Sequence, residues 1–305
     1  MRRPALLSFR TATLLAALAF ATPAGATEYF VTETGAGGDA VARGAYLVHA
    51  AGCIACHTAP GGQPLAGGRA MATPFGTFHT PNITPDPETG IGRWSDADFL
   101  QALQHGLSPA GEHYYPVFPF TSYTKAAPAD LLAIKAYLFA QAPVVAANKP
   151  HEIGFPFSVR LLQAGWKALF FRPGEFRPRA GAAPEVNRGA YLVQALGHCG
   201  ECHTPRNPAG GLLIGLALAG TSDGPDGEAV PNITPDRETG IGGWSVDDIA
   251  ELLASGTKPD FDNVQGSMGE VVEEGTAHLT AADRAAIGAY LLSLPPVRHG
   301  KPRGN

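Results

Sequence analysis

One short pattern occurs twice in this 305-residue chain and takes up all four of its cysteines. Cys53-Ile-Ala-Cys-His57 recurs further along as Cys199-Gly-Glu-Cys-His203. Two cysteines three positions apart on a helical turn can form thioether bonds to one edge of a porphyrin, and the histidine that follows can bind its iron. The pattern predicts two covalently bound haem c groups. They would be attached through Cys53, Cys56, Cys199 and Cys202, with His57 and His203 as the proximal iron ligands.

A C-x-x-C pair can also be a thiol redox centre, part of a zinc site or a disulfide. Zinc needs four ligands, and no further cysteine exists to complete either site. Two copies of the motif with its histidine, each at the same place in a repeated unit, favour haem over the thiol alternatives.

The motifs belong to a longer unit that is present twice. Arg-Gly-Ala-Tyr-Leu-Val occupies 43–48 and 188–193, and Pro-Asn-Ile-Thr-Pro-Asp occupies 81–86 and 231–236. The order is kept over a period far longer than the roughly 50 residues that mark solenoid repeats, so a whole domain has been duplicated in tandem. The predicted parts are a signal peptide over 1–26, a first domain over 38–147 (the first repeat), an aromatic and basic linker over 148–182 (the linker), and a second domain over 183–300 (the second repeat).

The N-terminus has the pattern of a secretory signal. Arg2, Arg3 and Arg10 precede a short apolar run, and Ala24-Gly-Ala26 predicts cleavage after Ala26. The run is much shorter than the about 20 residues that span a bilayer, which disfavours the alternative of a membrane anchor. We expect a periplasmic protein with no membrane span after cleavage. The formal charge of −5 becomes more negative when the arginines are removed, so nucleic-acid binding by charge is excluded.

Helix signals predict a mainly α fold in each unit. Helices are expected over 39–51 and 184–197, before the cysteine motifs, and over 128–141, with Leu131, Ile134 and Leu138 facing inward. Capping boxes start further helices at Ser95 and Ser245, and Thr280 starts the last one. The segments 58–93 and 204–243 are predicted as long loops rich in Gly and Pro, which line the haem crevices.

The second axial ligand of each iron should come from the loop before the last helix of each unit. In the second repeat that loop contains Met268, in a Gly-rich setting that offers little core for a methionine to fill. His198 and His278 are weaker alternatives. Met268 is therefore the predicted second ligand of the second haem.

The corresponding loop of the first repeat reads His113-Tyr-Tyr-Pro-Val-Phe-Pro-Phe120 and has no methionine. His113 is the predicted ligand there, which would make this haem bis-histidine. His79, His105, Met71 and an open iron position remain alternatives, as does an ordinary surface role for His113.

Other residues each have a structural and a functional interpretation. Trp94 and Trp244 are expected either to bond haem propionates or to pack in the core, and Arg206 either to pair with a propionate or to face solvent. The linker combines aromatic and basic side chains. We expect its aromatics to pack between the two haem units, with a docking surface for a partner as the alternative.

These motifs together resemble the dihaem cytochromes c that serve as electron-transfer subunits of periplasmic alcohol and aldehyde dehydrogenases. The resemblance rests on the Arg-Gly-Ala-Tyr-Leu-Val segments, Cys-His-Thr-Pro-Arg206, the Asn-Ile-Thr-Pro-Asp segments, the loop around Met268, and Tyr115-Pro-x-x-Pro-x-x-Ser-Tyr123. It implies a class I cytochrome c fold in each unit. In these subunits the Tyr-Pro loop usually carries a methionine where this chain has Phe118, and a third haem and a C-terminal membrane helix are often present.

The leading functional prediction is an electron carrier that passes electrons from a dehydrogenase to a cytochrome or oxidase. Histidine ligation gives a lower potential than methionine ligation, so electrons would enter at the first haem and leave by the second. The alternative is a dihaem enzyme, a peroxidase or a sulfur-compound oxidase, which uses the first haem as an open or switchable site.

Overall fold

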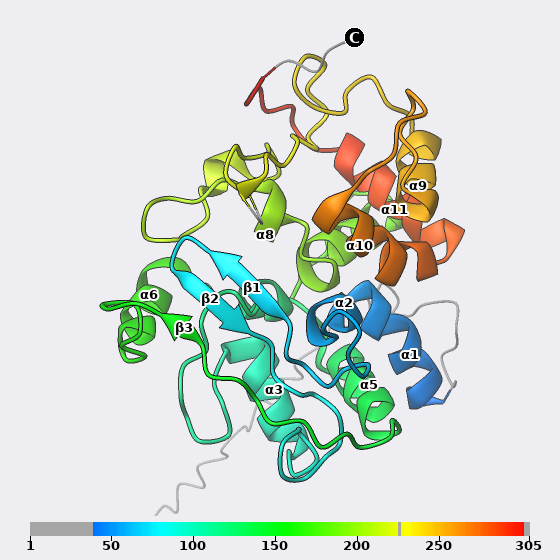
Figure 1. Cartoon of the computed structure of the whole chain (residues 1–305). Helices are drawn as coiled ribbons and strands as arrows, with labels where there is room; N and C mark the ends of the chain where they lie inside the picture. Colours follow the sequence, from blue (N-terminus) through cyan, green and yellow to red (C-terminus); the bar gives the residue numbers. More distant parts are fainter. Residues whose placement is uncertain (1–38, 225–226, 302–305) are drawn as a thin grey trace, which may run out of the picture.

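The computed structural model of this chain describes residues 39–224 and 227–301, so the signal peptide predicted over 1–26 lies outside the described residues. Helices dominate both repeats, which confirms the mainly α prediction. In Figure 1 the first repeat, blue to green, lies below the second, yellow-green to red.

The elements of the first repeat are α1 (Ala40–Ala50), α2 (Cys53–His57), β1 (Ala70–Thr73), β2 (Gly76–His79), α3 (Asp96–His105), α4 (Phe120–Tyr123) and α5 (Pro128–Phe139). The linker contains β3 (Glu152–Ile153) and α6 (Leu162–Phe170). The second repeat contains α7 (Pro184–Tyr191), η1 (Leu192–Leu196), α8 (Gly200–His203), η2 (Ile214–Leu216), α9 (Val246–Ser255), α10 (Gly266–Glu274), η4 (Thr276–His278) and α11 (Ala281–Leu292).

The helix starts lie where the capping signals predicted. Ser95 Oγ accepts the backbone N–H of Asp98 at 3.1 Å, and the Asp98 carboxylate accepts the backbone N–H of Ser95 at 2.9 Å. Ser245 and Asp248 repeat this box at 3.1 and 2.8 Å. Thr280 caps α11 through a single bond, in which its Oγ1 accepts the backbone N–H of Asp283 at 3.1 Å. These polar bonds satisfy backbone N–H groups that a helix start leaves open.

The first and last helices of each repeat cross at a glycine of the Arg-Gly-Ala-Tyr motif. A Cβ atom at Gly44 of α1 would lie 2.0 Å from the carbonyl oxygen of Ala133 in α5. A Cβ at Gly189 of α7 would lie 1.9 Å from the carbonyl oxygen of Ala286 in α11. Only glycine allows the two backbones to approach this closely, which explains the glycine in both copies.

The core sits on these crossings. The predicted inward face of α5 is confirmed, because Leu131, Ile134 and Leu138 are almost completely buried. In α11, Ile287 and Leu291 are buried in the same way.

One residue is inserted between the Arg-Gly-Ala-Tyr motif and the cysteine motif in the second repeat. Cys53 follows Arg43 by one position fewer than Cys199 follows Arg188. The helix absorbs the extra residue as a π-helical turn, η1, a form that accommodates single insertions. The predicted helix over 184–197 is therefore α7 and η1 in succession.

A small sheet joins the linker to the first repeat. Strands β1 and β2 form an antiparallel hairpin in which Met71 faces Phe78, and β3 pairs antiparallel with β2 through Gly76 and Ile153. The segment 58–93 was predicted as a loop, so the prediction was wrong for these two strands. The short strands have too few residues to show a period-2 pattern.

Within residues 39–224 and 227–301, the structure has no helix with the length and apolar character needed to cross a membrane.

Candidate functional site

Each C-x-x-C-H motif forms a short helix whose histidine is oriented by a backbone carbonyl. His57 Nδ1 bonds the carbonyl oxygen of Pro81 at 2.8 Å, and His203 Nδ1 bonds the carbonyl oxygen of Pro231 at the same distance. A donor proton on Nδ1 leaves the lone pair on Nε2, the atom that would bind a metal. Burial lowers the pKa of His57, with the bond to Pro81 acting in the opposite direction, so the ring is neutral as a ligand must be. Both histidines therefore have the geometry of iron ligands.

The thiols of these motifs are not joined in disulfides, and their pKa values are raised. All four cysteines are unpaired with each other. Burial raises the pKa of Cys53 and of Cys199 to about 12. A redox-active C-x-x-C pair needs a lowered pKa, so these pairs do not have the character of a thiol redox centre. Over the described ranges, no three His, Cys, Asp or Glu side chains are grouped as a metal ion would require, which disfavours the zinc alternative.

A large cavity opens next to the first motif. Its volume is about 790 Å³, within the range of cofactor sites. Cys53, Cys56 and His57 lie on its wall. The remaining lining is mainly apolar and includes Phe78, Ile91, Trp94, Phe99, Leu103, Phe118, Ile134 and Leu138. An apolar cavity with two thiols and a neutral imidazole on one wall fits a covalently attached haem, and Trp94 is placed to contact it.

Met268 of the second repeat lies in α10, on a half-buried position that packs against the core. The loop that precedes α10 has the same backbone bonds as the corresponding loop of the first repeat. Tyr114 donates its N–H to the Gly106 carbonyl at 2.8 Å, and Val264 donates to the Gly256 carbonyl at 2.9 Å. The two loops therefore run in register from these glycines onward.

The same sequence offset, continued beyond Tyr114 and Val264, aligns Phe118 with Met268, although Phe118 precedes α4 and Met268 lies within α10. Ser108 N–H bonds the Glu112 carbonyl at 2.9 Å, and Lys258 N–H bonds the Asp262 carbonyl at 2.8 Å, so the two loops match without a gap. Phe118 lines the cavity of the first repeat. A phenyl ring cannot bind iron, so Phe118 offers no ligand atom where an alignment of the repeats has the sulfur of Met268.

His113 does not occupy the ligand position that the sequence predicted. It pairs with Leu107 in a β-bridge, and its counterpart in the second repeat is Asn263, paired with Thr257. His113 is not among the residues that line the cavity. Its Nδ1 is buried with no hydrogen-bond partner among the described residues, and burial followed by the charge of Lys167 lowers its pKa. The histidine lies five positions before the residue that faces the haem site.

Two of the alternative ligands do line this cavity. Met71 of β1 and His79 of β2 are on its wall, whereas His105 is exposed. His79 bonds Glu152 through Nε2 at 3.1 Å, and its Nδ1 is buried without a partner in the described part of the chain. Of these three alternatives, Met71 and His79 are therefore the ones that reach the cavity.

The linker is part of the same cavity wall, which the sequence did not predict. Lys149, His151 and Arg160 line the cavity. Arg160 also donates to the His113 carbonyl at 2.9 Å and lies 4.9 Å from the centre of the Tyr115 ring. The basic residues of this aromatic segment were visible in the sequence. Nothing in the sequence indicated that β3 pairs with β2 and so brings these residues to the cavity.

Other linker side chains do pack between the repeats. Trp166 donates its indole N–H to the Ala209 carbonyl at 2.9 Å, and its ring packs edge-on against Phe120 of the first repeat, with centroids 6.5 Å apart. This contact supports the expected packing of linker aromatics between the two units.

The structure gives Arg206 a different partner from the predicted propionate. It forms an ion pair with Glu201 at 2.5 Å and donates to the Gly210 carbonyl at 2.8 Å. Glu201 lies inside the second cysteine motif, so a carboxylate of the chain itself takes the guanidinium. Trp244 packs against the core, as Trp94 does.

The two cysteine motifs lie close to each other. His198, directly before Cys199, lines the cavity of the first repeat. Burial raises the pKa of Cys202 to about 11, and Glu201 and then Cys56 of the other repeat add to this effect. His278 stacks on His49, with the ring centroids 3.9 Å apart, and bonds the Glu273 carbonyl.

Comparison with known proteins agrees with this site. The cytochrome c family model matches residues 41–140. The chain is 46% identical to a "diheme cytochrome c-type" protein of Cereibacter sphaeroides, over 84% of this chain and 86% of that protein. It is 43% identical to the gluconate 2-dehydrogenase cytochrome c subunit of Pantoea cypripedii and 39% identical to the alcohol dehydrogenase (quinone) cytochrome c subunit of Gluconobacter oxydans. The matches cover 83% and 87% of this chain, but only 59% and 56% of those subunits.

Proposed function

Because this chain belongs to the family of dihaem cytochromes c, we propose that it carries electrons in the periplasm from a dehydrogenase to a downstream cytochrome or oxidase. It is an electron-transfer protein and not itself a catalytic unit. The same holds for the cytochrome subunits of dehydrogenases that it resembles. The dehydrogenase partner is supported by those relatives' names, and the compartment is supported by the secretory signal over 1–26.

We further propose that each repeat is a class I cytochrome c domain that holds one haem. Equivalent helix caps, helix crossings and His–Pro carbonyl bonds in the two repeats support this reading. When bound, each haem supplies an iron that is reduced and oxidised by one electron. The chain attaches it through two thioethers, orients the proximal histidine through Pro81 or Pro231, and surrounds it with apolar side chains that exclude water.

The observation that carries the functional proposal is the pairing of Phe118 with Met268. A methionine ligand raises the potential of a haem relative to histidine, and the first site has no ligand from the equivalent loop. The first site is therefore proposed as the lower-potential, electron-accepting side, and the second as the higher-potential side. Met71 and His79 are the proposed sources of any second ligand at the first site.

The same observation favours one second candidate, a dihaem enzyme with an open iron at the first site. An enzyme of this kind must bind an external ligand where Phe118 stands. The relatives with assigned roles are electron-transfer subunits, which favours the carrier.

Absorption spectroscopy of the purified protein, with and without cyanide, tests this proposal. Denaturing gels stained for haem should first show covalent haem, with two per chain by pyridine haemochrome assay. Fully low-spin ferric spectra that cyanide does not change support the carrier. A high-spin component that cyanide converts to low-spin supports the enzyme, and a chain without covalent haem overturns both.

A further inference from the structure

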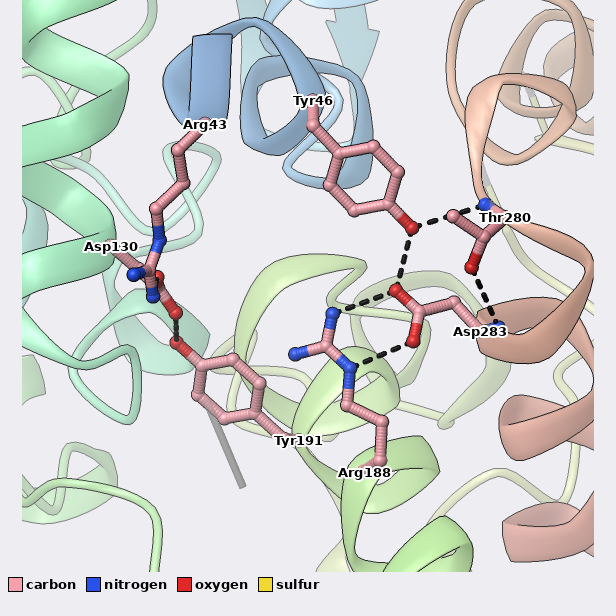
Figure 2. A network of polar contacts seen from close by, with 7 residues as sticks. All are labelled: Arg43, Tyr46, Asp130, Arg188, Tyr191, Thr280 and Asp283. Carbon is pink, nitrogen blue, oxygen red and sulfur yellow. Dashed lines mark hydrogen bonds and ion pairs between the residues drawn. The ribbon is translucent and has the colours of Figure 1, made fainter. Parts of the chain in front are cut away.

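The Arg-Gly-Ala-Tyr motifs of the two repeats meet at one place between them (Figure 2). The glycines of these motifs have the role described above, in the crossing of helices within each repeat. The arginines and tyrosines have a different arrangement, which links each repeat to the other.

Within each repeat the arginine pairs with an aspartate of its own last helix. Arg43 of α1 pairs with Asp130 of α5. Arg188 of α7 pairs with Asp283 of α11 through two bonds, from Nε at 2.8 Å and from Nη2 at 2.7 Å. Each arginine therefore has a carboxylate partner within its own repeat.

The tyrosines cross between the repeats. Tyr46 of the first repeat donates its hydroxyl to Asp283 of the second at 2.6 Å, and Tyr191 of the second donates to Asp130 of the first at 2.5 Å. Each hydroxyl also accepts a backbone N–H of the opposite repeat at 3.1 Å, from Thr280 and Ala127 respectively. The contacts are reciprocal, as in an interface with two-fold symmetry.

These crossed bonds are buried and charge-assisted. The side chain of Asp130 is fully buried, and that of Asp283 is 10% exposed. Burial, followed by the bond to Asp283, raises the pKa of Tyr46 to about 12. Burial, followed by Asp130, raises the pKa of Tyr191 well above its ordinary value. Both hydroxyls therefore stay protonated and remain donors. Hydrogen bonds to a carboxylate are stronger than those between neutral groups.

A second pair of contacts joins each cysteine motif to the opposite repeat. Arg69 bonds the Ala55 carbonyl of the first motif and pairs with Glu270 of α10, which also carries Met268, at 2.5 Å. Glu201 of the second motif accepts the hydroxyl of Thr121 in α4 at 2.6 Å. The crossed tyrosines thus lie in an interface that reaches both haem attachment sites.

We propose that Tyr46 and Tyr191 are positioning residues that set the spacing of the two haem sites, so that an electron can pass directly from one site to the other within the chain. This inference rests on the proposed function. The bonds that each tyrosine hydroxyl makes to an aspartate and to a backbone N–H both reach the opposite repeat. Electron transfer slows steeply with distance, so a joint that fixes the spacing has a functional consequence.

The test is the variant Tyr46→Phe/Tyr191→Phe in the full holoprotein, which keeps both rings and removes both hydroxyls. Tyr290→Phe is the matched control, because its hydroxyl accepts a bond from Gln194 within the second repeat at 2.7 Å. The readouts are the distance distribution between the two ferric irons by pulsed electron paramagnetic resonance, and the rate of electron transfer between the sites after injection of one electron. The single variant Tyr46→Phe replaces the double variant if the latter does not fold.

We expect the double variant to broaden the iron–iron distance distribution and to slow transfer between the sites by about tenfold in total, since the loss of both carboxylate bonds lowers the population that has the native spacing. The absorption spectrum of each haem should not change, and the control should behave as the wild type. An unchanged distance and rate in a variant with two normal haems overturns the proposal for the tyrosines alone. A wild-type protein without two haems overturns the proposed function instead.

Discussion

The two repeats share their helix caps and helix crossings, and they differ at the end of the loop that follows α3 in one and α9 in the other. Ser95 and Ser245 cap their helices with the same bonds, and the loops that follow these helices run in register. At the end of that register one repeat has Phe118 and the other has Met268. The local backbone differs as well, because Phe118 lies in the turn before α4 and Met268 lies within α10. We propose that this difference gives the two haems different redox properties.

The largest expected effect is the loss of one haem. Cys53→Ala/Cys56→Ala should leave one covalent haem per chain, in the second repeat, because neither thioether of the first can form. Cys199→Ala/Cys202→Ala should leave one in the first. The pyridine haemochrome assay per mole of chain checks this. Two haems in either double variant would contradict the assignment.

The next largest effect is on the reduction potentials of the haems, which should shift in opposite directions in the two repeats. Phe118→Met should supply sulfur to the first iron and raise the potential of that haem, and Met268→Leu should lower the potential of the second and increase its high-spin character. We expect shifts on the order of 100 mV, within the roughly 0.8 V that axial ligands span. Potentiometric titration with absorption readout measures both.

Val117→Met is the control for this pair, because Val117 also lines the cavity but stands one position away from the register of Met268. It should leave the potential of the first haem close to that of the wild type. An equal rise for Val117→Met and Phe118→Met would show that the register is wrong.

Replacing the more deeply buried of the two aspartates should lower the free energy of unfolding by the larger amount. Asp130→Ala leaves Arg43 without its aspartate in a buried site, so we expect a loss of about 3–5 kcal/mol in the free energy of unfolding. Asp283→Ala should cost less, because the side chain of Asp283 is 10% exposed. Urea denaturation measures both. Asp96→Ala breaks an ion pair in which Asp96 is 70% exposed and should cost about 1 kcal/mol or less.

The helix caps should show no difference between the repeats. Ser95→Ala and Ser245→Ala each remove one cap, and each should lower the free energy of unfolding by about 1 kcal/mol. Thermal unfolding of the two variants checks this. A cap that matters in only one repeat would contradict the equivalence of the scaffolds.

The smallest effect is on pH dependence. The side-chain and backbone bonds of Ser95 lower the pKa of Asp98 from its ordinary value of 3.8, and those of Ser245 do the same for Asp248. A lowered pKa in the folded state stabilises the protein above pH 3.8, and this contribution is lost as the pH falls through the lowered value. Asp98→Asn should therefore reduce the dependence of stability on pH in that acidic window, measured by urea denaturation at several pH values. An unchanged dependence would contradict the role of the cap.

Local features of the fold could be predicted from the sequence. A capping box needs only Ser95 and Asp98, and the proximal ligands need only the cysteine motifs, because these groups interact within one helical turn. The buried face of α5 followed from the spacing of Leu131, Ile134 and Leu138 for the same reason.

Features that depend on distant segments could not be predicted. The pairing of Gly76 with Ile153 joins β2 to the linker, and that pairing brings His151 and Arg160 to the haem cavity. His113 was chosen as a ligand because it lies in the correct loop. The resemblance to dehydrogenase subunits already pointed to Phe118 as the position of a methionine, but the β-bridge that holds His113 against Leu107 depends on backbone bonds that no sequence pattern revealed.

A potentiometric titration of the intact protein tests the central claim most directly. The unequal second positions predict two separate midpoint potentials, with the lower one assigned to the first repeat by the shift that Phe118→Met produces. A single common potential, or a lower potential that moves with Met268→Leu and not with Phe118→Met, would contradict it.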